Sequence, residues 1–164
     1  MDFLHTVVRI SNVDDSLRFY CEGLGLKELR RVNNEGGRFT LIFLATEIDI
    51  KRANLTGTES GFIAGLPMLE LTHNWPPKGK EEGNGSSEDY AGGRNFGHLA
   101  YQSDDIYAKC QHIMDMGYTI NRPPHDGRMA FVRSPDGISV ELLQKDTPLP
   151  ARSPWKDMKN VGEW

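Results

Sequence analysis

Apolar and polar positions follow two periods along this chain, and the two periods recur in the same order in both halves. Residues 3–10 form an apolar, β-branched run that predicts a strand. Residues 13–24 carry apolar side chains at helical spacing, and Asn12 precedes them as a candidate N-cap. Further strands are predicted over residues 26–32, 39–45 and 67–74, and a polar stretch without a predicted element fills residues 46–65. The first half therefore predicts a βαβββ unit.

The second half repeats this order after a break. Asp104 and Asp105 open a predicted helix that Gly117 ends. One strand is predicted before it, at 96–103, and three after it, at 118–121, 129–133 and 138–143. The pattern predicts an α+β protein in which two βαβββ modules in tandem form a curved mixed sheet.

The break between the halves is rich in Pro, Gly, Ser and charged residues, so we expect it to be a surface linker. We predict one domain over residues 1–145, made of modules 1–75 and 96–145 joined by linker 76–95. Residues 146–164 form a Pro- and Trp-containing tail to which we assign no regular structure. The first module is longer, and we place its insertion at residues 46–65.

Both modules carry one histidine in the first strand and one glutamate in an apolar last strand. These residues are His5 and Glu70 in the first module, and His98 and Glu141 in the second. A carboxylate in an apolar strand needs a partner, because burying it bare costs several kcal/mol. Two imidazoles and two carboxylates make an N2O2 donor set for one divalent metal such as zinc, nickel, cobalt, manganese or iron.

Strand alternation places two more polar side chains beside this donor set. Arg9 shares a face of its strand with His5, and Asn74 shares a face with Glu70. An arginine there is suited to grip a substrate carboxylate through two parallel hydrogen bonds, and the amide is suited to a peptide-like group. We interpret the other histidines, His73, His112 and His125, as solvated or structural.

Composition narrows the function classes. The chain has 164 residues, is 38% hydrophobic and has a formal net charge of -4, without a basic block. This makes nucleic acid and anionic membrane poor partners. No apolar run approaches the ~20 residues of a membrane span, and the first residues lack the features of a signal peptide, so we expect a cytoplasmic protein. Two cysteines exclude a disulfide framework.

Five segments resemble the glyoxalase I family (lactoylglutathione lyases) of the vicinal-oxygen-chelate superfamily. Two of them, Glu-Leu-Thr-His-Asn-Trp from Glu70 and Phe-Gly-His ending at His98, are highly specific to that family. The matching segments are Leu4-His5-Thr6 with Arg9, Asp15 to Tyr20 with Leu24-Gly25-Leu26, Glu70 to Trp75, Arg94 to His98, and Ser134 to Gly137 with Val140-Glu141-Leu142. Together they cover most of residues 3–145.

The resemblance implies a specific site and reaction. Its metal ligands would be His5, Glu70, His98 and Glu141, and its glutathione contacts Arg9, Asn74, Arg94, Arg122 and Arg128. It implies isomerisation of the methylglyoxal–glutathione hemithioacetal to S-D-lactoylglutathione through a metal-bound enediolate, with Glu141 as general base and Glu70 as its pseudo-symmetric partner. It further implies a homodimer whose active sites take ligands from both chains.

The metal and two rival functions stay open. A first-strand histidine and a short N-terminus resemble nickel- or cobalt-dependent bacterial members, whereas the long segment between Glu70 and His98 resembles zinc-dependent ones. A ring-cleaving iron dioxygenase is the enzymatic rival, although it uses two histidines and one carboxylate. A non-catalytic small-molecule binder of the same fold is the rival from another class, and it needs no metal.

Overall fold

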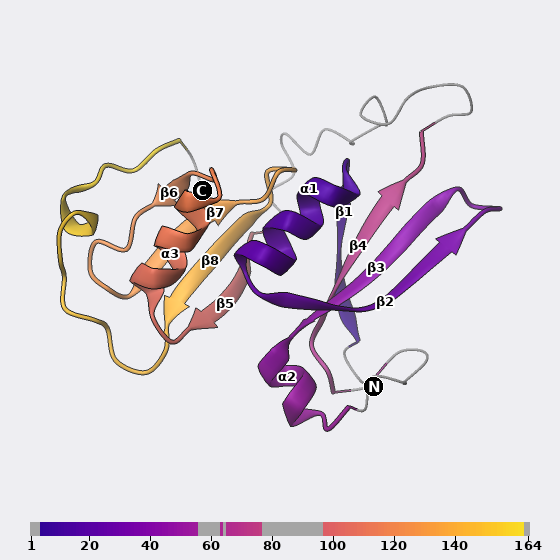
Figure 1. The fold of residues 1–164 in the computed structure, drawn as a ribbon, viewed down its shortest axis with the longest axis horizontal. Helices are drawn as coiled ribbons and strands as arrows, with labels where there is room; N and C mark the ends of the chain where they lie inside the picture. Colours follow the sequence, from indigo (N-terminus) through magenta and orange to yellow (C-terminus); the bar gives the residue numbers. More distant parts are fainter. Residues whose placement is uncertain (1–3, 56–62, 64, 77–96, 163–164) are drawn as a thin grey trace. The chain divides into compact units, whose positions relative to one another are not determined.

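The computed structural model describes residues 4–55, 63, 65–76 and 97–162, and the chain divides into two units, Met1–Asp89 and Tyr90–Trp164. Each unit contains one four-stranded mixed sheet (Figure 1). The predicted linker, residues 76–95, lies almost entirely outside the described residues.

The first unit builds its sheet in the strand order β1-β4-β3-β2. Strands β1 and β4 are parallel, and the other neighbours are antiparallel. The elements are β1 (His5–Ile10), α1 (Val13–Leu17), the π-helix η1 (Arg18–Gly23), β2 (Leu26–Asn34), β3 (Phe39–Thr46), α2 (Glu47–Arg52) and β4 (Met68–Asn74).

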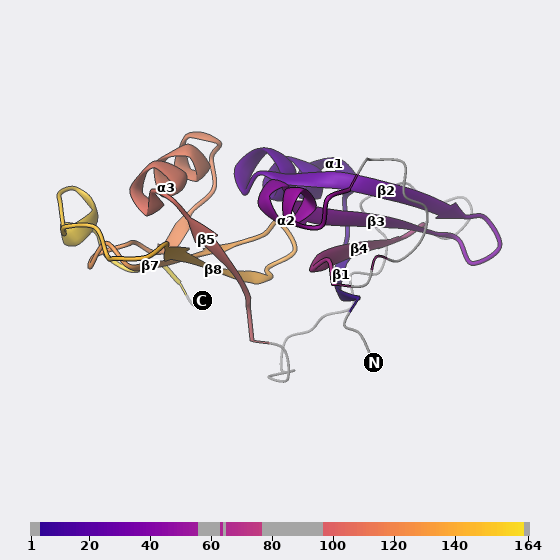
Figure 2. The ribbon, with the colours of Figure 1, turned by 90° about the horizontal axis from the view of Figure 1, so that it is seen from below.

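The second unit repeats this topology as β5-β8-β7-β6. The edge strand β5 is again parallel to its neighbour β8, and the other neighbours are antiparallel. Helix α3 packs on one face of this sheet (Figure 2). The elements are β5 (Leu99–Ser103), α3 (Ile106–Asp115), β6 (Ile120–Arg122), β7 (Met129–Arg133), β8 (Ser139–Gln144) and the 3-10 turn η2 (Trp155–Asp157). The same strand order and directions in both units confirm the predicted α+β fold of tandem βαβββ modules.

The first helix begins where the sequence predicts it. The Asn12 side chain accepts a hydrogen bond of 2.9 Å from the backbone N–H of Asp15, which satisfies one of the free donors of the helix end. The prediction of one regular helix was wrong beyond Leu17, because the backbone widens there into a π-helix. That segment buries the rings of Phe19 and Tyr20 completely.

Helix α2 was not predicted from the sequence, which we interpreted after residue 45 as a polar stretch without a regular element. The Thr46 side chain caps this helix by accepting from the backbone N–H of Asp49 at 3.1 Å. Its Ile50, together with the C-cap residue Ala53, packs on an apolar cluster of Phe43, Ala45, Leu66 and Met68. Sequence patterning did not reveal this helix because its six residues are too short for a clear period.

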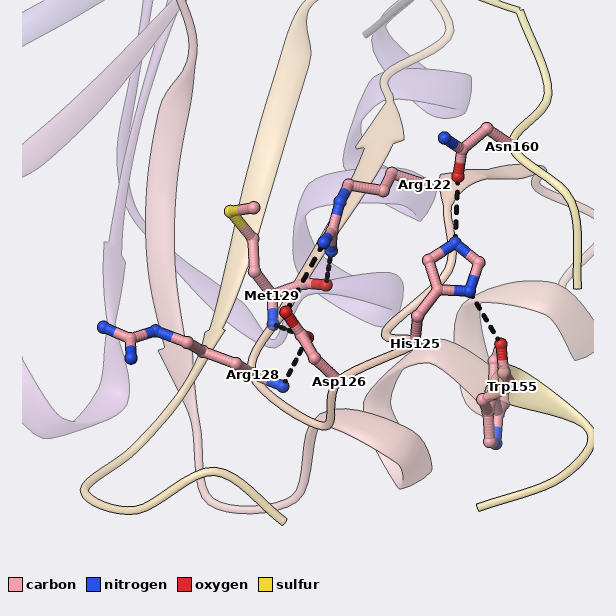
Figure 3. Close-up of polar contacts among 7 residues, drawn as sticks. All are labelled: Arg122, His125, Asp126, Arg128, Met129, Trp155 and Asn160. Carbon is pink, nitrogen blue, oxygen red and sulfur yellow. Dashed lines mark hydrogen bonds and ion pairs between the residues drawn. The ribbon is translucent and has the colours of Figure 1, made fainter. Parts of the chain in front are cut away.

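The C-terminal tail packs against the second unit. Trp155 is buried, and its carbonyl oxygen lies 3.1 Å from Nδ1 of His125, whose Nε2 lies 3.0 Å from Oδ1 of Asn160 (Figure 3). The Tyr107 hydroxyl donates to the Pro150 carbonyl at 3.0 Å. The prediction of no regular structure was wrong for Trp155–Asp157, which form a 3-10 turn.

Candidate metal centre

The first histidine and glutamate meet because their strands pair in parallel. In the β1–β4 register Glu70 lies opposite Val7, which is two residues beyond His5 and therefore on the same face of the sheet. This places His5 Nε2 3.0 Å from Glu70 Oε2. Glu70 is buried, with 7% of its surface exposed.

The second unit builds the same pair with the same offset. Glu141 lies opposite Ala100 in the β5–β8 register, and Ala100 is two residues beyond His98. Here His98 Nε2 lies 3.1 Å from Glu141 Oε2. The same His–Glu pair therefore occurs at the same strand register in both units, as expected for a duplicated βαβββ module.

An aromatic ring supports each pair, and sequence reasoning missed both rings. Phe43 lies opposite Glu70 in the β3–β4 register and meets the His5 ring edge-on, with 5.7 Å between centroids. Phe131 lies opposite Glu141 and meets the His98 ring in the same way at 5.4 Å. Each half carries a phenylalanine in the strand that pairs antiparallel with the glutamate strand. In the first half, however, both Phe39 and Phe43 lie in that strand, and only the register shows that Phe43 is the one opposite Glu70. These contacts hold the imidazoles in place.

The two carboxylates differ in their surroundings. Glu70 also accepts a hydrogen bond on its Oε1, from the Thr72 hydroxyl at 3.1 Å. At the equivalent position in the second unit, two residues beyond Glu141, stands Leu143, whose side chain cannot donate a hydrogen bond. The second pair is also more open, with 42% of the His98 side chain exposed against 20% for His5.

The donor set fits a divalent metal. Imidazole nitrogen and carboxylate oxygen are both ligands of zinc and of related divalent ions. In each His–Glu pair one such nitrogen and one such oxygen lie 3.0 or 3.1 Å apart, close enough to ligate the same ion. Within the described parts of the chain no three His, Cys, Asp or Glu side chains gather into one cluster.

The predicted substrate contacts of the first unit lie on the sheet face that carries the first pair. Arg9 is opposite Thr72 in the β1–β4 register, and Asn74 ends β4 on the same face. Both side chains are exposed at the surface. The face beside the first pair therefore presents a cation and an amide to solvent.

The predicted contacts of the second unit are partly occupied within it. The Arg122 guanidinium donates to the Met129 carbonyl and lies 3.5 Å from an Asp126 carboxylate oxygen (Figure 3). The pKa of Asp126 lies below its ordinary value: burial opposes this, but backbone N–H groups of Arg128 and Met129, together with Arg122, outweigh it. The Arg128 side chain is exposed. Arg94 lies outside the described residues.

His73 points to the opposite side of the first sheet and is buried, with 5% exposed. It lines a cavity of about 280 Å³ together with Thr40, Trp75 and the start of α1. The Trp75 indole N–H donates to Thr40 at 2.8 Å there. The interpretation of His73 as structural fits this position, away from the His5–Glu70 pair.

The chain matches the family model described as the Glyoxalase/Bleomycin resistance protein/Dioxygenase superfamily over residues 2–142. It belongs to this superfamily, and the tandem fold and the paired donors described above agree with that membership. None of the helices among the described residues has the length and apolar character required to cross a membrane.

The relatives within the superfamily narrow the class further. A probable lactoylglutathione lyase of Synechocystis sp. is 35% identical, over 88% of this chain and 95% of that protein. A lactoylglutathione lyase of Neisseria meningitidis is 36% identical, over 88% and 91%. The structure of the trypanothione-dependent glyoxalase I of Leishmania major superposes with a TM-score of 0.63 at 30% identity, over 87% and 85%. The chain is a member of the lactoylglutathione lyase, or glyoxalase I, family.

Proposed function

We propose that this enzyme isomerises the hemithioacetal of methylglyoxal and glutathione to S-D-lactoylglutathione in the cytoplasm, and so detoxifies methylglyoxal. The observation that carries the proposal is the His–Glu pair built at one register in both units, with 3.0 and 3.1 Å between the donor atoms. The relatives named above support the choice of reaction over others on this fold.

We propose that His5, Glu70, His98 and Glu141 together hold one divalent ion, either zinc or nickel, with cobalt as a further candidate. Two carboxylates balance the charge of a divalent cation, and the imidazoles complete an N2O2 set. When bound, such an ion polarises the substrate carbonyl and makes the neighbouring C–H bond acidic.

Glu141 is the proposed general base. Its carboxylate takes the proton from C1, the carbon that carries the sulfur and the hydroxyl group, and returns that proton to C2, the former carbonyl carbon. The C1 hydroxyl oxygen becomes the thioester carbonyl and the C2 oxygen becomes the new hydroxyl, so the reaction is a net isomerisation. Glu70 is the pseudo-symmetric carboxylate that would serve the opposite enantiomer.

The glutathione part of the substrate needs cations and amides at some distance from the reacting carbons. We propose Arg9 and Asn74 for this role, since both are exposed on the face that carries the first pair. Arg94, Arg122 and Arg128 are the further candidates, and Arg122 must share its guanidinium with Met129 and Asp126. Because the glyoxalase I of Leishmania major is described as trypanothione-dependent, the hemithioacetals of glutathione and of trypanothione should both be assayed as substrates.

We further propose a homodimer in which each active site joins the pair of one unit in one chain to the pair of the other unit in the second chain. This arrangement gives each ion four protein ligands. Each chain supplies two ligands to each of the two sites. The proposal rests on the resemblance to the glyoxalase I family, and closed two-fold symmetry would make any such shared site occur twice.

The test is isomerase activity of chelator-stripped protein on methylglyoxal plus glutathione, with zinc, nickel or cobalt restored in turn. We expect the stripped protein to be inactive and at least one metal to restore it. Glu141→Gln should lower kcat by about 10²–10⁴-fold, whereas Glu47→Gln, at an exposed glutamate of α2, should not.

Other results of the same assay would identify a rival function. Oxygen uptake with catechols by the iron-loaded protein would indicate a ring-cleaving dioxygenase. Ligand binding by a protein that is indifferent to every metal would indicate a binding protein of this fold. Either result, without formation of the lactoyl thioester, would refute the proposal.

A further inference from the structure

We propose that Thr72 is a positioning residue that restrains Glu70 and thereby makes Glu141 the faster of the two bases. The inference rests on the proposed function and deepens it. It explains how two carboxylates at equivalent places in a duplicated fold take different roles.

The contacts of Glu70 use both oxygens of its carboxylate. Oε2 lies 3.0 Å from His5 Nε2, and Oε1 accepts the Thr72 hydroxyl at 3.1 Å. Thr72 is two residues beyond Glu70 on the same strand, so its hydroxyl is on the same face of the sheet. With Oε1 held in this way, only Oε2 is presented beside the imidazole.

Among the residues that the structure describes, only His98 contacts the Glu141 carboxylate through a polar group. Its Oε2 lies 3.1 Å from His98 Nε2, and no described residue donates a hydrogen bond to its Oε1. The position equivalent to Thr72 is Leu143, which has no hydrogen-bonding side chain. The Glu141 side chain is also more exposed than that of Glu70, 15% against 9%.

These differences assign the roles. A carboxylate that moves a proton between two carbon atoms must turn an oxygen towards each of them during the reaction. Glu141 can do so by rotating about its last bond, because no described side chain holds its second oxygen. Glu70 would first have to give up a hydrogen bond to its charged group, which slows it on the order of tenfold or more.

The test compares variants that differ by one hydroxyl group. Thr72→Val keeps the shape and β-branching of the side chain and removes the hydroxyl, and Thr72→Ser keeps the hydroxyl. The first readout is the dissociation constant of zinc or nickel alone, measured by chelator competition. We expect Thr72→Val to weaken metal binding by on the order of tenfold, and Thr72→Ser to restore it to within a few-fold.

The second readout is the rate in the Glu141→Gln background. Removing the Thr72 hydroxyl there releases Glu70, so the Thr72→Val/Glu141→Gln double variant should turn over faster than Glu141→Gln alone. The proposal is overturned if Thr72→Val binds metal as the wild type does, or if the double variant is no faster. If Thr72→Val does not fold, the pair Thr72→Ala and Thr72→Ser gives the same comparison.

Failure of this inference and failure of the proposed function give different results. A wild-type protein that binds metal but forms no lactoyl thioester refutes the reaction, while the metal affinities still test whether Thr72 positions Glu70. A wild-type protein that binds neither metal refutes both. An active wild type whose Thr72→Val variant keeps its metal affinity refutes the positioning role alone.

Discussion

The attachment of the tail to the second unit depends on a glycine, and replacing it gives a quantitative test of the fold. Gly127 has a φ of +67°, and a Cβ built on it would lie 1.9 Å from the Leu149 carbonyl oxygen and 2.7 Å from its carbon. The two backbones are also joined by a hydrogen bond of 3.0 Å from Leu149 N–H to the Gly127 carbonyl. Gly127→Ala therefore forces the tail away from this turn.

Two contributions set the size of the effect. A left-handed backbone costs a residue with a Cβ about 1–2 kcal/mol. Loss of the Leu149 hydrogen bond adds about 1 kcal/mol. We expect Gly127→Ala to lower the free energy of unfolding by about 2–3 kcal/mol. Gly117→Ala is the matched control: its φ is +92° and no described atom lies within 4 Å of a Cβ there, so only the first contribution applies.

The assay is urea unfolding followed by circular dichroism, combined with limited trypsin digestion of the native protein. Gly127→Ala should be less stable than Gly117→Ala by at least ~1 kcal/mol. It should also be cut faster after Arg152 or Lys156 of the tail. Equal stability losses in the two variants, with equal digestion rates, would show that the tail does not depend on this close approach.

Three further outcomes follow from the site and the core. Arg9→Ala should raise KM several-fold with little change in kcat, since Arg9 is assigned to a part of the substrate that does not react; a loss in kcat alone would contradict that assignment. Mixing inactive His5→Gln and His98→Gln proteins should restore about a quarter of the wild-type activity if sites join two chains, and none if each site lies within one chain. Burial raises the pKa of both thiols, that of Cys110 to about 12. Because Cys110 is completely buried and Cys21 only half-buried, a thiol reagent applied to the native protein should label Cys21 and reach Cys110 only after unfolding.

The fold was predictable because hydrophobic periodicity carries most of its information. Strand alternation and the recurrence of one pattern in both halves predicted two βαβββ modules, and the observed strand orders confirm them. Short elements were not predictable in this way. Helix α2 depends on packing of Ile50 and Ala53 against the sheet, and this contact is tertiary.

The site was predictable as a set of residue types and less so as an arrangement. A glutamate in an apolar strand indicated Glu70 and Glu141, because such a group needs a partner. The partner of each followed from the parallel pairing of strands far apart in the chain, and single-sequence patterns do not define that register. Phe43, Phe131 and Thr72 were missed for this reason, since their roles appear only once the neighbours of each glutamate are known.

The duplicated fold also carries a chemical constraint. In the proposed site, two equivalent modules would supply a neutral, paired donor set, but they would also supply two equivalent bases. If one carboxylate is to carry most of the proton transfer, it must be the more mobile of the two. The hydroxyl of Thr72 in the first unit and the apolar Leu143 in the second are one difference between the modules, beside the greater exposure of the second pair. If the proposed roles hold, we expect exchange of the residue two positions beyond each glutamate to shift the base from one module to the other.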